Sequence, residues 1–111
     1  MRVCLKHGIQ IDKLTPQGVL ILIVVAGVYD ELGLNCTVTS GNDPGHMDSS
    51  KHYEGNALDF RTRDIQPVVA SKIPGLCRIA LGPDFDVVYE NKDGVTHLHV
   101  EYDPKSAPLS A

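Results

Sequence analysis

Three residues in two separate stretches of the chain have the chemistry of a catalytic metal site. His52 and Asp59 lie seven positions apart, with Gly55 between them, and His99 closes a His-Leu-His triplet further along the chain. Two imidazole nitrogens and one carboxylate oxygen suit zinc, and three protein ligands leave a fourth position for water. We therefore expect His52, Asp59 and His99 to bind zinc, while noting that other divalent metals accept the same set.

A hydrolytic metal site also needs a general base and a group that stabilises negative charge. Glu90, shortly before the His-Leu-His triplet, is the first candidate for the base, and Asp93 and Glu101 are the alternatives. His97 and His46 are the candidates for stabilising an oxyanion. Spacing alone does not decide the matter, because a His-x-His strand or a glutamate at a strand end is more often an exposed polar face.

Two predicted strands must bring the candidate ligands together. Residues 57–62 and 95–102 alternate apolar and polar side chains, which is typical of half-buried strands. The alternation places Asp59 and His99 on the polar face of their strands. Gly55 permits a sharp turn that returns His52 over Asp59.

The remaining elements predict one α+β domain over residues 1–111. Thr15, Pro16 and Gly33 are capping signals around an apolar run, so we expect a core helix that is covered on most sides. Arg61 and Arg63 are expected to pair with nearby acidic side chains. The other expected elements are a strand at 34–39, a short helix at 64–72, strands at 76–81 and 85–90 joined by a hairpin turn, and a loose tail at 104–111. The fold class is therefore an antiparallel sheet packed on a core helix.

Composition narrows the class of partner. The chain has 111 residues and a formal net charge of −4, which argues against binding to nucleic acid. Its longest apolar run, residues 19–28, is too short to insert across a membrane.

Three scattered cysteines without a C-x-x-C pair are expected to be free thiols. The first residues show no secretion signal, so we expect a protein made in the cytoplasm, and we expect a monomer.

The stretch of residues 50–59 resembles the S-x-H-x-x-G-x-A-x-D signature of the zinc D-alanyl-D-alanine carboxypeptidase and L,D-endopeptidase family, which shares its fold with the hedgehog signalling domain. The triplet 97–99 resembles the second signature, H-x-H. The amino-acid sequences of residues 52–59 and of residues 85–90 are especially similar to those of hedgehog proteins. The resemblance covers about residues 15–103.

The resemblance implies zinc ligands at His52, Asp59 and His99, with His97 near the substrate carbonyl. It also places His46 and Glu90 near the positions of further site residues. Two positions depart from the peptidase pattern. Thr96 stands where many peptidases have an acid, and Asn42 and Asp43 follow Ser40-Gly41 where many have an arginine for a substrate carboxylate. These departures weaken a strict carboxypeptidase interpretation.

The expected function is zinc-dependent hydrolysis of amide bonds in peptidoglycan stem peptides, of the D,D-carboxypeptidase or L,D-endopeptidase type. Such a protein would be a bacterial or phage cell-wall lytic enzyme, acting after release from the cell or as a virion component. The alternative is a non-catalytic, zinc-stabilised binding module of hedgehog-like fold. A glutamate acting as base distinguishes the two, because only an enzyme needs it.

Overall fold

The structure, a computed structural model, describes residues 1–44 and 50–105. Within these residues the strands form one five-stranded sheet in the order β1-β2-β3-β5-β4. The elements are, in chain order, β1 (Val3–Leu5), α1 (Pro16–Glu31), β2 (Cys36–Ser40), β3 (Ala57–Arg61), α2 (Pro67–Ala70), α3 (Ile73–Leu81), β4 (Phe85–Lys92) and β5 (Val95–Tyr102). The α+β class is confirmed.

The sheet is mixed, and the expectation of a purely antiparallel sheet was wrong. β1 runs parallel to β2, whereas the pairs β2–β3, β3–β5 and β4–β5 are antiparallel. The three-residue β1 is too short for its sequence pattern to specify a partner. Its pairing depends on how residues 6–15 return to α1.

Helix α1 forms where its capping residues predict it. The Thr15 side chain accepts a hydrogen bond from the Gly18 backbone N–H, and Pro16 occupies the first turn. Gly33 follows the helix with φ +72°, in the left-handed region that glycine favours. One side of α1 supplies buried side chains such as Ile21, Val25 and Tyr29 to the core.

The expectation that α1 is covered on most sides holds except along one strip of the helix. Buried and half-buried residues occupy most of its circumference, but Val19, Leu20 and Ile23 are 43%, 45% and 53% exposed. These residues lie on the helix side that faces away from the sheet. An apolar sequence all round therefore did not mean burial all round, since a two-layer domain leaves the outer side of a helix open.

Residues 76–81 are helical, so the predicted strand there, with its hairpin turn, was wrong. They form most of α3, which has Pro74 in its first turn and is followed by Gly82, whose φ is +87°. Ile73 and Cys77 are fully buried, whereas Ile79 is 84% exposed. This one-sided burial follows the helical period of 3.6 residues.

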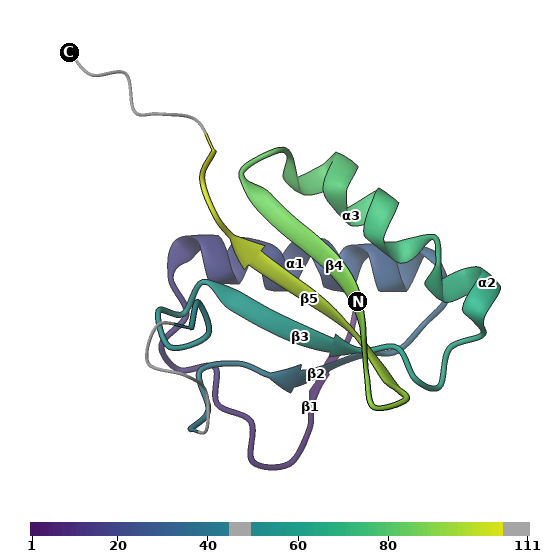
Figure 1. Ribbon diagram of the computed structural model, residues 1–111, viewed down its shortest axis with the longest axis horizontal. Helices are drawn as coiled ribbons and strands as arrows, with labels where there is room; N and C mark the ends of the chain where they lie inside the picture. Colours follow the sequence, from purple (N-terminus) through teal and green to yellow (C-terminus); the bar gives the residue numbers. More distant parts are fainter. Residues whose placement is uncertain (45–49, 106–111) are drawn as a thin grey trace.

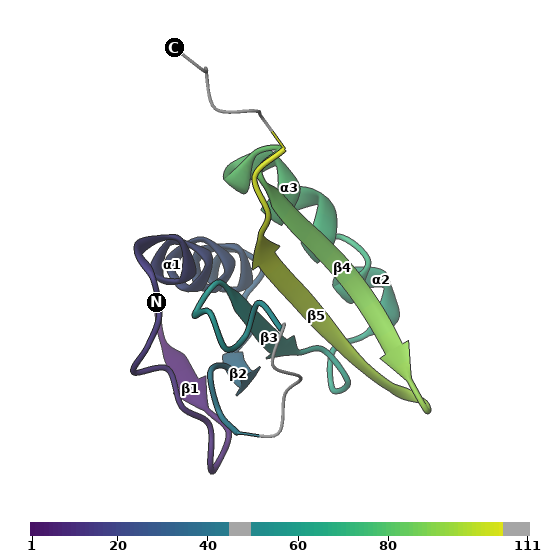
Figure 2. The ribbon, with the colours of Figure 1, turned by 60° about the vertical axis from the view of Figure 1, so that its left-hand side comes forward.

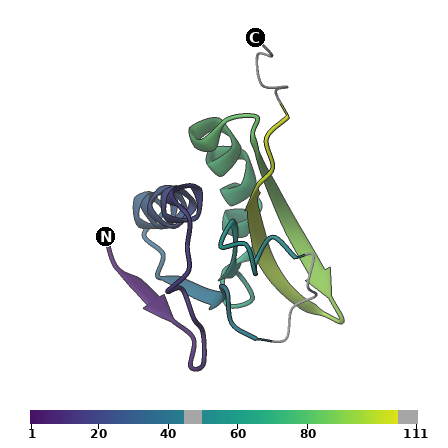
Figure 3. The same cartoon turned by 90° about the vertical axis from the view of Figure 1, so that its left-hand side faces the viewer.

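Both long helices pack on the same face of the sheet. In Figure 1 α1 lies behind the strands, and Figure 3 shows α1 and α3 on one side of β4 and β5. The buried face of the sheet includes Leu58, Phe60, Leu98 and Val100, all fully buried, as their alternation predicts. Among the described elements no helix covers the opposite face, which Figure 1 presents to the viewer.

The long β4–β5 hairpin extends beyond β3, as Figure 2 shows.

The three cysteines are free thiols, as expected, with Cys36 and Cys77 buried in the core. Burial raises the pKa of Cys36 to about 12 and that of Cys77 to about 11. Within residues 1–44 and 50–105 there is no helix with the length and apolar character needed to span a bilayer.

Candidate metal centre

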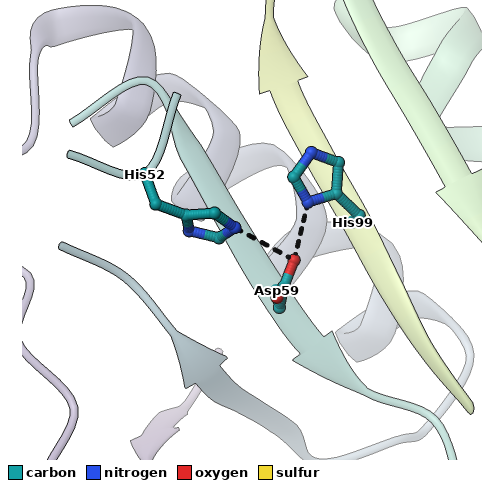
Figure 4. A group of neighbouring side chains, drawn as sticks. All are labelled: His52, Asp59 and His99. Atoms are coloured by element: carbon teal, nitrogen blue, oxygen red, sulfur yellow. Dashed lines mark hydrogen bonds and ion pairs between the residues drawn. The ribbon is translucent and has the colours of Figure 1, made fainter. Parts of the chain in front are cut away.

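His52, Asp59 and His99 meet on the open face of the sheet. The His99 Nδ1 atom lies 2.8 Å from Asp59 Oδ1, and the His52 Nε2 atom lies 3.5 Å from the same oxygen. Figure 4 shows a nitrogen of each imidazole ring directed at this carboxylate, and the two ring centroids lie 5.2 Å apart. One potential ligand atom from each residue lies within 4.8 Å of the others. The site thus joins a loop to two central strands.

Strand pairing fixes two of the three residues. Asp59 on β3 is directly opposite His99 on β5 in the antiparallel register. Their strands alternate with fully buried apolar neighbours on the other face, so both side chains must point away from the core. A one-residue slip of this pairing would bury both polar side chains, and the register is therefore strongly specified.

The loop that carries His52 is fixed to the start of α1. The Gly55 carbonyl oxygen accepts a hydrogen bond from the Thr15 backbone N–H at 3.1 Å. Gly55 has φ +75°, and a Cβ atom on Gly18 would lie only 2.2 Å from the Gly55 oxygen. Both glycines are therefore required for this close approach. It holds His52, which is about 7% exposed, over Asp59.

A backbone contact orients the His52 ring. Its Nδ1 atom lies 3.1 Å from the Gly41 carbonyl oxygen, which can only accept a hydrogen bond. When Nδ1 carries the hydrogen, the Nε2 lone pair is directed at Asp59. An imidazole lone pair facing a carboxylate needs a proton or a cation between them. Zinc bound at about 2.0–2.2 Å from nitrogen and oxygen ligands fits donor atoms at these separations.

Carboxylates hold the His99 ring on both sides. Besides the Asp59 contact, His99 Nε2 lies 2.8 Å from Glu101 Oε1. Burial alone would lower the pKa of His99, but the hydrogen bonds to Asp59 and Glu101 outweigh it and raise the pKa to about 9. Glu101 therefore orients a candidate metal ligand. Sequence reasoning considered Glu101 only as a base, although its position two residues after His99 indicates a shared face.

Asp59 stays negatively charged in this environment. Burial would raise its pKa, yet the hydrogen bonds from His52 and His99 outweigh that effect and hold the pKa well below its usual range. A carboxylate that keeps its charge between two imidazoles is suited to binding a cation.

Glu90 and His97 form a second pair on the same face. The two residues are directly opposite each other across β4 and β5, with Glu90 Oε2 2.9 Å from His97 Nε2. Of the other candidate bases, Glu101 is engaged by His99. Asp93 lies exposed in the β4–β5 turn with φ +53°. His46 lies outside the described residues.

The expected ion pairs of Arg61 and Arg63 are absent from the part of the chain that the structure describes. Arg61 lies opposite His97, two residues along the strands from the candidate ligands Asp59 and His99. No described carboxylate lies within 4.0 Å of the guanidinium group of Arg61 or Arg63. The Thr96 hydroxyl accepts a hydrogen bond from the Thr62 hydroxyl at 3.0 Å. Thr96 thus has a structural partner in the place where many peptidases carry an acid.

Comparison with known proteins identifies the family. The family model of the hedgehog amino-terminal signalling domain matches residues 17–101, which is well over half of the chain. This chain belongs to the hedgehog amino-terminal signalling domain family. The hedgehog part of the sequence resemblance is thereby confirmed, and the mixed sheet with helices on one face is consistent with the hedgehog domain fold.

Curated hedgehog proteins of Danio rerio are similar to the chain. Tiggy-winkle hedgehog protein is 40% identical over 70 residues, which cover 60% of this chain and 15% of that protein. Sonic hedgehog protein gives the same identity and coverage, and Indian hedgehog B protein is 37% identical over 71 residues, covering 62% and 16%. The chain thus spans about a sixth of these relatives. No solved structure matches it significantly.

The hedgehog family match includes every described residue of the candidate site. His52, Asp59, Glu90, His97 and His99 all fall within residues 17–101. The family match and the candidate site therefore lie in the same part of the molecule.

Proposed function

We propose that His52, Asp59 and His99 bind zinc and that the chain hydrolyses amide bonds of peptides, with peptidoglycan stem peptides as its substrate. The convergence of two imidazole nitrogens on one Asp59 oxygen, on an open sheet face, is the observation that supports this most strongly. Bound zinc would supply a Lewis acid that polarises a carbonyl and lowers the pKa of a water molecule. The three ligands leave room for that water.

Glu90 and His97 are the proposed proton-handling pair. His97 is two residues from His99, so its side chain lies on the same face about 7 Å along the strand. A proton taken from the attacking water can rest on Glu90 as a carboxylic acid or on His97 as an imidazolium. The pair can then return it to the leaving amine, and an N–H group of His97 can donate a hydrogen bond to the developing oxyanion.

The test is mass spectrometry of purified peptidoglycan fragments incubated with zinc-loaded protein. The expected result is a new fragment with the unmodified chain, none with Glu90→Gln, and normal cleavage with Glu31→Gln, an exposed glutamate at the end of α1. Equal cleavage by the Glu90→Gln variant would exclude Glu90 as the base. Activity unaffected by His52→Ala and His99→Ala would exclude the metal mechanism.

The second candidate is a non-catalytic binding module in which zinc ties the His52 loop to the sheet. The family match favours it, because the similar relatives are hedgehog proteins. In this case zinc would raise the free energy of unfolding without any hydrolysis. No cleavage of any fragment by folded, zinc-loaded protein would establish this candidate over the enzyme.

A further inference from the structure

A cleft beside the metal centre has an unusual charge. It encloses about 260 Å³ on the open face and reaches from the end of β1 across β2 and β3 to β5. Its lining includes three cationic side chains, Lys6, Arg61 and Arg63, and one carboxylate, that of the candidate ligand Asp59. The chain as a whole has 14 acidic and only 10 basic Lys and Arg residues, so this concentration of positive charge is local.

These three cations have no ion-pair partner within residues 1–44 and 50–105. Every described Lys or Arg contact to a carboxylate at 4.0 Å or less involves Lys51 or Lys105. Like charges that share one cleft repel each other, and this repulsion costs free energy unless an anion offsets it. The only carboxylate in the lining is that of Asp59, which His52 and His99 already contact, so the three cations leave the cleft with the electrostatics of an anion-binding site.

A hydroxyl group and the planar guanidinium groups add directional contacts. Thr39 lines the same cleft, and its hydroxyl can donate a hydrogen bond. Arginine presents a rigid fork of N–H donors that matches the two oxygens of a carboxylate. The cleft is large enough to hold one carboxylate together with a short stretch of the peptide that carries this carboxylate.

The register places this cleft next to the centre. Arg61 is directly opposite His97, and Asp59 is directly opposite His99, so the two rows lie two residues apart on the same strands. That separation is about 7 Å along the strand. An extended peptide covers it in about two residues. A peptide whose amide lies at the centre would thus place a group within two residues of that amide in the cleft.

We propose that this cleft binds a carboxylate of the peptide ligand, through Arg61, Arg63 and Lys6, within about two residues of the amide held at the metal centre. The proposal rests on the proposed function, because it names the ligand class of the same site. These three cationic side chains would select the substrate, and none of them is a candidate metal ligand.

The test is an NMR titration of zinc-loaded Glu90→Gln protein, in which turnover is blocked. The ligands are N-acetyl-D-alanyl-D-alanine and the same dipeptide with a C-terminal amide, followed through the Arg61 and Arg63 side-chain N–H resonances. We expect the acid to bind at least about tenfold tighter than the amide, and Arg61→Gln to remove that difference. Arg2→Gln, an exposed arginine outside the cleft, should leave both affinities unchanged.

Equal affinities for acid and amide, or unchanged affinities in both Arg61→Gln and Arg63→Gln, would overturn the proposal. Tighter binding of inorganic phosphate than of the carboxylate would also overturn it, because the site would then select phosphate. A repeat with zinc-free protein separates the two claims. Arginine-dependent binding of the acid by a protein that binds no zinc would support the cleft and refute the metal centre. Hydrolysis of the acid and the amide with equal KM by the unmodified, zinc-loaded chain would support the metal centre and refute the cleft.

Discussion

Asp59 is the residue on which the candidate centre depends. Its Oδ1 atom receives both His52 and His99, and its carboxyl keeps its charge because the hydrogen bonds from those rings outweigh the effect of burial. Without a metal, the proton on the His99 ring offsets that charge. With a metal, the cation replaces this proton, because ligand histidines must be neutral. Zinc and protons therefore compete for the same atoms.

This competition predicts proton release on zinc binding. The pKa of His99 in the metal-free protein is about 9, so the ring is protonated near pH 7.5 and must lose its proton to bind zinc. We expect about one proton released per zinc near pH 7.5, and progressively less as the pH rises above about 9. Calorimetric titrations of zinc in two buffers with different ionisation enthalpies measure this number. Identical heats in both buffers would contradict it.

Glu101 should affect zinc affinity without touching the ion. Its carboxylate holds His99 Nε2 at 2.8 Å and fixes the ring with Nδ1 toward Asp59. We expect Glu101→Gln to weaken zinc binding by about 10- to 100-fold, which is usual for the loss of a group that orients a ligand. Competition with a chromophoric chelator measures the affinity. Glu31→Gln, an exposed carboxylate at the end of α1, is the matched control and should have no effect.

At the scale of elements, local signals predicted α1, β3 and β5 well. Capping residues define α1, and alternation assigns the faces of β3 and β5, including the facing positions of Asp59 and His99. The prediction failed at α3 because the apolar residues from Leu76 onward were taken alone. Including Ile73 and Pro74 gives the spacing Ile73, Cys77, Leu81, which is a helical period with proline in the first turn.

The parts that sequence could not supply depend on tertiary contacts. The parallel pairing of β1 rests on three residues whose pattern favours no partner. The contacts of His52 with the Gly41 oxygen and of Glu101 with His99 Nε2 exist only once loop and strands are in place. The unpaired state of Arg61 depends equally on which acids the fold brings near. From the acidic residues near Arg61 in the sequence, we expected an ion pair instead.

Helix α1 contains a matched pair of glycines that tests how it holds the site. A Cβ at Gly18 would lie 2.2 Å from the Gly55 oxygen, whereas a Cβ at Gly27 has no atom within 4 Å. We expect Gly27→Ala to raise the free energy of unfolding by about 0.5–1 kcal/mol through helix propensity. Gly18→Ala should lower it and also weaken zinc binding, because the loop carrying His52 must shift.

Chemical denaturation and zinc competition on both variants provide the measurement. If Gly18→Ala is as stable as Gly27→Ala and binds zinc normally, the close approach between α1 and the loop does not position His52.

At the scale of the whole molecule, one sheet separates an apolar core from a face that carries charges. The metal centre, the Glu90–His97 pair and the cationic cleft all lie on that open face. The overall stability of the zinc-free protein should therefore depend on the protonation of this face.

The pKa of His99 determines whether the free energy of unfolding rises or falls with pH. Because the folded value of about 9 exceeds the ordinary value of 6.5, the contribution of His99 is fully present below about pH 6.5 and is lost as the pH rises through 9. We expect the free energy of unfolding of zinc-free protein to fall over this window by about 2–3 kcal/mol at most. Asp59, with a lowered pKa, acts in the opposite direction and only in acid.

Denaturant titrations across pH 6.5 to 9 measure this slope. It should disappear in His99→Asn. It should also be absent from zinc-loaded protein, in which His99 is already deprotonated. A slope of unchanged size in His99→Asn would assign the effect to another group.

The most direct test of the metal centre is the zinc content and affinity of purified protein, measured by elemental analysis and chelator competition beside Asp59→Asn. We predict one tightly bound zinc per folded chain. For Asp59→Asn we predict a folded chain with little or no zinc, since the amide keeps the shape but removes the charge that His52 and His99 share. Folded protein that takes up no zinc, or an Asp59→Asn variant that binds zinc equally well, would contradict the account.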